Sequence, residues 1–185
     1  MSVTSPATLA DHIDFLVLQP DEERSVVRDL MAAVLAFNAH GRGGALQISF
    51  PLFTDAKVTR RQVLGPCVRV TGPAERLYVL TLRYEISAHL RAGRAMTLVR
   101  DQIVVDAGRF EHFNLLDQAQ NMPAVSATRT IVLSGQSRLI EMAGRMGVTV
   151  DNEAVFVARG ESVQARSGII DLLGFSATNT VPIIR

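Results

Sequence analysis

The order of hydrophobic patterns in the first half of the chain constrains the fold more than any other feature. Apolar residues alternate along 12–18, as in a strand with one buried face. A helical pattern begins at Pro20 and ends before the glycine-rich segment 40–44. Short apolar runs follow at 46–50 and 67–71. The sequence therefore predicts a strand, a helix and two further strands.

A second helix is predicted directly after Pro73. We expect Leu77, Val79 and Leu80 to face the core from this helix, and the run 102–105 to form the next strand. The resulting order of strand, helix, strand, strand, helix and strand is the ferredoxin-like one, which RNA-recognition modules also use. Many unrelated proteins share it, so the order does not establish a function by itself.

The second half of the chain has a different pattern. A short helix is predicted over 134–146, with Ser134 as its N-cap. Further strands are predicted at 123–133, 154–158 and 181–184. We therefore expect an α+β protein with a ferredoxin-like (RRM-like) N-terminal domain over 1–121. A small C-terminal domain over 122–185 would carry strands and a short arginine-bearing helix.

Charge is unevenly distributed along a chain whose net charge is only +1. Acidic residues dominate the segment 11–29, whereas basic residues outnumber acidic ones between Lys57 and Arg109. Lys57 is the only lysine, and arginine offers a planar fork that suits phosphates and base edges. Codon bias towards arginine explains the same composition equally well. The asymmetry favours an anionic partner for the middle of the chain.

Several kinds of site are excluded by residue types and spacing. The single cysteine, Cys67, excludes an intrachain disulfide and a cysteine-based zinc site. The histidines lack metal-ligand spacing, and the glycine-rich segment lacks the ending of a phosphate-binding loop, so we expect no metal and no other cofactor. No signal peptide and no membrane-spanning run is present, so we expect a cytoplasmic protein without a membrane partner.

One segment carries the prediction further. The run LQISFPLFTDA at 46–56 resembles the second strand and following loop of the CRISPR repeat-RNA endoribonucleases of type I-F systems and their transposon-associated variants. Gln47 stands where that family often has glycine. The resemblance continues, in family order over about half of the chain, at AFN (36–38), VSATR (125–129), SGQSRL (134–139), GFS (174–176) and VPI (181–183). Type IV systems contain a related processing subunit, and the departures of this chain are similar to that branch.

The resemblance implies a mode of RNA binding. In this family an arginine-rich helix of the smaller domain enters the major groove of a repeat hairpin, and the matching positions here are Arg129, Arg138 and Arg145. Arg138 and Arg145 are seven residues apart, so they share a helical face. A solvated helix face is the ordinary interpretation, and Glu141 fits it. The family's helix carries more arginines than this one.

The resemblance also implies a reaction, from which this chain departs. Family members cut RNA without metal: a histidine on the first helix activates the ribose 2′-hydroxyl, which attacks its own phosphate. That histidine falls on Leu35, and the family's late tyrosine falls on Leu173. Leucine cannot transfer a proton. Whether the chain is an enzyme is therefore left open.

Three other residues are candidates for the lost chemistry. His40 offers an imidazole for proton transfer, Arg42 would stabilise the phosphorane charge, and Ser49 would polarise the nucleophile. The ordinary interpretations are an exposed loop histidine and a structural serine in a strand.

Three functions remain open. In the first, the chain cuts the repeat and remains on the 3′ hairpin as a subunit of a CRISPR effector complex, next to a backbone subunit and other CRISPR-associated subunits. Alternatively, it caps the hairpin without cutting. The third alternative is a ferredoxin-like domain that binds a protein or a small molecule and has no role with RNA.

Overall fold

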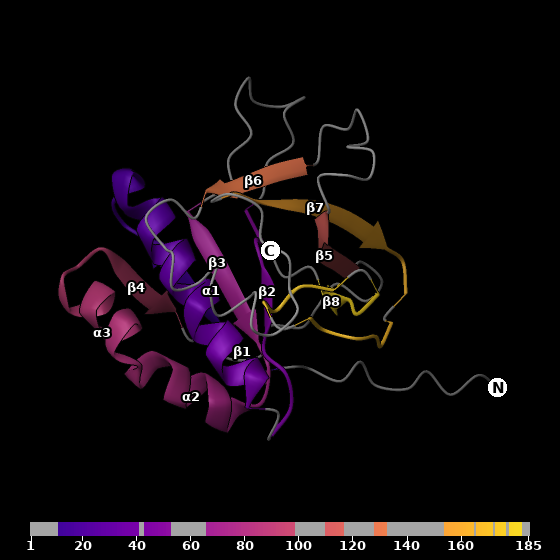
Figure 1. Cartoon of the computed structure of the whole chain (residues 1–185), viewed down its shortest axis with the longest axis horizontal. Coiled ribbons are helices and arrows are strands. Elements are labelled where there is room, and N and C mark those ends of the chain that lie inside the picture. The colour runs from indigo at the N-terminus through magenta and orange to yellow at the C-terminus, as the bar shows by residue number, and fades with distance from the viewer. Residues whose placement is uncertain are drawn as a thin grey trace.

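The computed structural model describes most of the first half of the chain and the strands of the second half. The described residues are 11–40, 43–52, 66–98, 110–116, 128–132, 154–164, 166–171, 173–176 and 178–182. They form two antiparallel sheets, and the helices lie against the first sheet (Figure 1). The predicted α+β class is confirmed.

The first sheet contains four strands in the order β2-β3-β1-β4. Its strands are β1 (His12–Val17), β2 (Gln47–Ser49), β3 (Cys67–Thr71) and β4 (Ala95–Leu98). Each neighbouring pair is antiparallel. β2 and β3 are consecutive strands and are neighbours in the sheet. A helix connects β1, in the middle of the sheet, to β2 at its edge.

The helices begin and end where the sequence places proline, glycine and extended backbone. A 3-10 turn, η1 (Pro20–Glu22), leads into α1 (Glu23–Ala39), and α2 (Ala74–Leu82) begins after Pro73. Arg83 then takes an extended conformation, with ψ of 138°, which ends α2 and starts α3 (Tyr84–Arg91). The predicted second helix corresponds to α2, and a sharp break at Arg83 separates it from α3.

The core of the protein lies between the first sheet and α1. Alternate residues of β1, Ile13, Phe15 and Val17, are buried on the helix side, as a period of two requires. The helix contributes a continuous apolar stripe at helical spacing: Val26, Val27, Leu30, Met31, Val34 and Leu35. Burying one such side chain stabilises the fold by about 1.5–3 kcal/mol before entropy is counted.

The second sheet has the order β6-β7-β5-β8. Its strands are β5 (Phe110–Leu116), β6 (Thr128–Val132), β7 (Ala154–Ser162) and β8 (Val181–Pro182). Phe113 of β5 meets Phe50 edge to face, with ring centroids 5.4 Å apart, and Phe175 stacks on the other side of Phe50 at 6.4 Å. Both sheets therefore contribute to one hydrophobic core. β5 precedes the predicted boundary at 121/122 and its partners follow it; the boundary itself stays a prediction.

Most of the strands expected from sequence are present. The strands predicted at 12–18, 46–50, 67–71 and 154–158 correspond to β1, β2, β3 and β7. Parts of 123–133 and 181–184 form β6 and β8. The strand predicted at 102–105 and the helix predicted at 134–146 lie outside the described residues.

Three features of the first half differ from the expectation. Val79 was expected in the core but is 47% exposed, because it follows Leu77 by two residues and so lies on the other side of α2. Neither α3 nor β4 was predicted. In α3 the fully buried residues are Ile86 and His89, so a histidine occupies one of the core-facing positions of this short helix.

A buried ion pair joins β1 to β3 on the sheet face opposite the helices. Asp14 and Arg69 are register partners, and each side chain is only 4% exposed. The Nε of Arg69 donates to Asp14 Oδ1 over 2.7 Å, and Nη2 donates to Oδ2 over 2.8 Å. This two-bond geometry satisfies both carboxylate oxygens, as a buried charge requires.

We expect Arg69→Met to lower the free energy of unfolding by about 3–5 kcal/mol, because it leaves the carboxylate of Asp14 buried without its partner. The double variant Asp14→Leu, Arg69→Met should recover most of that loss, since apolar side chains need no partner there. Urea unfolding measures both. The matched control is Arg28→Met, which breaks the more exposed pair with Asp29 and should cost less than about 1 kcal/mol. Equal losses for the two single variants would contradict this interpretation.

Candidate functional site

The end of α1, the start of β2 and a distant loop before β8 meet beside β2. The side-chain amide of Asn38, near the end of α1, accepts a hydrogen bond from Leu46 N over 2.8 Å and donates to Leu46 O over 3.0 Å. It also donates to the backbone oxygen of Asp171 over 3.4 Å. We call the contact of Asn38, residues 46–48, Asp171 and residues 173–176 the closing seam.

Gly174 brings the closing seam together. Its carbonyl accepts a 2.7 Å hydrogen bond from Ile48 N, so the loop continues the hydrogen bonding of β2 on the side away from β3. Gly174 has φ of +88°, and a Cβ on it would lie 2.8 Å from Cγ1 of Val34 and 3.1 Å from Leu46 O. Only glycine fits this approach without displacing the helix or the strand.

Polar side chains fix the rest of the loop. The hydroxyl of Ser176 donates to Ile169 O over 2.6 Å and accepts from the backbone nitrogens of Thr178 and Asn179. Asn179 donates to Oε1 of Gln47 over 2.5 Å, and Gln47 donates back to Asn179 O over 3.1 Å. Gln47, which stands at the family's glycine position, therefore ties the loop to β2.

The two positions that correspond to the family's proton-transfer groups belong to the hydrophobic core. Leu35 and Leu173 are both 0% exposed, and both lie in the same cluster as Phe50 and Phe175. A polar group at either place would be buried, which costs stability unless it has hydrogen-bond partners. The two positions that the resemblance predicts for proton transfer are thus filled by core side chains.

The proposed replacement residues are not gathered at one point. His40 is exposed at the C-terminal end of α1, and its Nδ1 lies 2.6 Å from Ala36 O, so the ring bonds back along its own helix. Ser49 is 0% exposed, and it is paired with Arg69 on the sheet face opposite Ile48 and α1. Arg42 lies outside the described residues. The catalytic roles of all three stay predictions.

Ser49 has a distinctive environment nonetheless. Its Oγ is buried and has no hydrogen-bond partner, and the same holds for Nη1 of Arg69, the residue directly opposite on β3. Buried polar atoms of this kind are rare in folded proteins. The pair marks a polar spot within the covered face of the first sheet, next to the Asp14 ion pair.

Arg76 holds the end of α1 and was missed by the sequence analysis. Its guanidinium donates to Phe37 O and lies 5.3 Å over the Phe37 ring, while Gly43 lies beside its aliphatic stem. Partial burial lowers the pKa of Arg76. A carbonyl at the C-terminal end of a helix attracts a cation, so the position of Arg76 suits the helix dipole. An arginine in the first turn of a predicted helix is too common a feature to identify Arg76 from the sequence.

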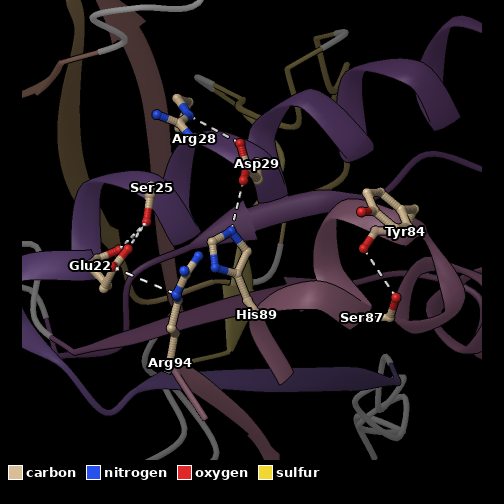
Figure 2. A network of polar contacts seen from close by, with 8 residues as sticks. All are labelled: Glu22, Ser25, Arg28, Asp29, Tyr84, Ser87, His89 and Arg94. Carbon is tan, nitrogen blue, oxygen red and sulfur yellow. Dashed lines mark hydrogen bonds and ion pairs between the residues drawn. The ribbon is translucent and has the colours of Figure 1, made fainter. Parts of the chain in front are cut away.

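The acidic residues of the first helix are engaged within the protein (Figure 2). Nε2 of His89, on α3, lies 2.7 Å from Oδ2 of Asp29, and Arg28 donates to Oδ1 of Asp29 over 3.0 Å. Glu22 accepts a 2.6 Å hydrogen bond from Ser25, which is the main cause of its lowered pKa, and Arg94 lies 3.7 Å away. His89 is 5% exposed and its Nδ1 is buried without a partner, so the pair with Asp29 joins α1 to α3 and is closed to a substrate.

The predicted RNA-binding arginines are mostly outside the described residues. Arg129 lies in β6, paired with Val157 of β7, and Arg138 and Arg145 fall in a range that the structure does not describe. Among the described residues, no group of three or more histidine, cysteine, aspartate or glutamate side chains is placed to hold a metal ion. No helix in the same ranges has the length and apolar composition needed to cross a bilayer.

Comparison with known proteins adds no relative. No protein-family model and no curated protein sequence matches the chain. The interpretation of the site therefore depends on its own residues and contacts.

Asp171 gives the seam a dependence on pH. Its carboxylate accepts the backbone N–H of Phe175 over 2.9 Å, but burial outweighs the backbone hydrogen bonds and raises the pKa of the group above 3.8. An acid whose pKa is raised by folding stabilises the fold most below its unfolded pKa, and that contribution is lost as pH rises through the folded pKa. The ionised form is therefore the less favourable one within the fold.

We expect Asp171→Asn to gain stability relative to the wild type as pH rises from about 4 to 7, because the amide oxygen still accepts from Phe175 without carrying a charge. Chemical denaturation at several pH values measures the difference between the two proteins. Asp11→Asn, at an exposed carboxylate, is the control and should show no such trend. A relative stability of Asp171→Asn that falls with rising pH would contradict the sign of the shift.

Proposed function

We propose that the chain binds the hairpin of a CRISPR repeat RNA and remains on the 3′ hairpin as a subunit of an effector complex. The closing seam is the observation that carries this proposal. Asn38 contacts Leu46, and Gly174 contacts Ile48, so three of the segments on which the resemblance rests, 36–38, 46–50 and 174–176, adjoin at β2.

The fold supports the same proposal. The order β2-β3-β1-β4, with antiparallel neighbours and helices between β1 and β2 and between β3 and β4, is the arrangement expected of a ferredoxin-like domain. We assign the first sheet and its helices to that fold. The pairing of Asp29 and Glu22 with His89, Arg28 and Arg94 also weakens the objection that an acidic first helix would repel RNA.

Capping of the hairpin fits the site better than cutting does. Leu35 and Leu173 fill the positions of the family's histidine and tyrosine, and both are fully buried. His40 is held to Ala36 at the end of α1, and Ser49 lies on the other side of β2. Cutting would require His40 to leave Ala36 and turn towards the RNA.

A second candidate function is supported by the outer face of α2 and α3. Four large apolar side chains are exposed there, including both tyrosines of the chain: Tyr78 at 66%, Val79 at 47%, Leu82 at 60% and Tyr84 at 76%. Exposed apolar groups of this size that lie together often mark a protein-binding surface. A protein-interaction domain without an RNA role would use this face.

The first test concerns the arginines of the second half. Replacing Arg129, Arg138 or Arg145 with alanine should weaken binding of the cognate hairpin by about 1–3 kcal/mol each if it contacts base edges. Fluorescence anisotropy with a labelled repeat hairpin at two salt concentrations measures the loss, and binding should weaken with salt. Arg28→Ala is the control, because Arg28 is engaged with Asp29. Equal affinity of the wild type for the hairpin and an unrelated RNA of the same length would favour the protein-interaction role instead.

The second test concerns cleavage. If the chain cuts the repeat, cutting should proceed in EDTA and leave a 2′,3′-cyclic phosphate, since the resemblance implies a reaction without metal. His40→Ala should then slow it by about 10²–10⁴-fold and leave hairpin affinity nearly unchanged. Gel analysis of the products and a parallel binding titration separate the two effects. A hairpin that is bound tightly and never cut would establish the capping role, and magnesium-dependent cutting would reject the mechanism.

A further inference from the structure

The outer face of the second sheet carries a row of residues that the proposed hairpin site does not include. Gly160 on β7 lies opposite His112 on β5 in the antiparallel ladder. Glu111 pairs with Val181 in the ladder between β5 and β8. Continuing this ladder by one residue places Thr180 beside His112, on the side opposite Gly160. Thr180 N donates to Arg166 O over 3.0 Å, and Arg166 N donates to Thr180 Oγ1 over 2.8 Å. We call these four residues the His112 row.

The imidazole of His112 faces outwards. Its neighbours along β5, Glu111 and Phe113, are 1% and 0% exposed, whereas His112 is partly exposed, so the alternation of the strand puts it on the opposite face. Gly160 provides the space for the ring. A Cβ on Gly160 would lie 2.2 Å from Cε1 and 2.4 Å from Nε2 of His112. Any other residue at 160 would therefore displace the imidazole.

The environment of His112 favours the neutral imidazole with its hydrogen on Nε2. Burial lowers the pKa of His112, and the charge of Arg166 lowers it further. Nδ1 is buried without a hydrogen-bond partner. A buried N–H without an acceptor is less tolerable than a bare acceptor, so the hydrogen belongs on Nε2. His112 Nε2 and the exposed Arg166, whose backbone is joined to Thr180, are the two donors of the row.

We propose that the His112 row binds an anionic phosphate oxygen, with Arg166 supplying the charge and His112 Nε2 a neutral N–H donor. This inference rests on the proposed function, in which the phosphate is a phosphodiester of the RNA that the chain binds. Arginine and histidine N–H groups are donors suited to phosphate oxygens. Glu111 does not compete for them, because it is buried on the other face, where Arg159 donates to it over 2.9 Å.

Inorganic phosphate tests the row directly. In NMR spectra of the full chain, the Cε1–H resonance of His112 should shift and saturate as inorganic phosphate is added. Arg166→Ala should abolish most of that shift, whereas Arg91→Ala, which removes an exposed arginine on α3, should leave it intact. No shift in the wild type, or the same shift in both variants, would overturn the proposal.

Hairpin binding separates the source of the phosphate. Arg166→Ala should weaken binding by about tenfold, since it removes a charge-assisted contact, and should reduce the salt slope by about 1. His112→Leu and Gly160→Ala should each weaken binding several-fold, whereas His112→Gln, which keeps an N–H donor, should lose less. Thermal melting checks that Gly160→Ala still folds. If it does not fold, the two His112 variants still test the row.

The outcomes distinguish this inference from the proposed function. If the wild type prefers the hairpin and the row variants bind it as Arg91→Ala does, the RNA role of the row is wrong and the proposed function stands. If the wild type does not prefer the hairpin, the proposed function fails, and the RNA role of the row fails with it. The phosphate titration then decides whether the row is a site for free phosphate.

Discussion

The outer edge of β2 is the constraint on which the rest of the structure depends. β2 is the edge strand of the first sheet, so its backbone groups on the side away from β3 need partners from elsewhere in the chain. Gly174 and Asn38 provide them, by accepting from Ile48 N and by bonding both backbone groups of Leu46. Because Gly174 belongs to the loop before β8, closing this edge brings the second sheet against the first. One three-residue strand thereby joins the two halves of the molecule.

The shared core follows from this closure. Phe175, one residue after Gly174, is drawn against Phe50, and Phe113 meets the same ring from β5. Ser176 N donates to Phe113 O over 2.7 Å, which links the loop to β5 as well as to β2. Neither sheet would therefore unfold without exposing apolar surface of the other, and we expect the described residues to unfold as one cooperative unit.

The sequence predicted the fold where the pattern is local and missed it where the partner is distant. β1 and β3 were predicted because alternation and a compact β-branched run are visible within a few residues. α3 was not predicted, because its buried residues include His89, whose partner Asp29 lies on α1. Asp14 and Arg69 are 55 residues apart in sequence, and Gln47 and Asn179 are 132 apart, so only tertiary contact identifies these pairs. Gly174 belongs to the GFS motif of the resemblance. The requirement for glycine there, a positive φ and a close approach to Val34, is a property of the packed structure.

In the candidate site, Leu35 and Leu173 were singled out from the sequence, but their place in the core is visible only in the structure. A histidine and a tyrosine at a catalytic centre need solvent access and partners, and both reduce local stability. Leucine at 35 and 173 instead completes the core at the point where α1, β2 and the closing loop meet. In the proposed role, binding a hairpin needs a fixed relation between the two sheets, to which this shared packing contributes. Under that proposal, the two leucines that leave no group for proton transfer are also the residues that complete the packing of the closing seam.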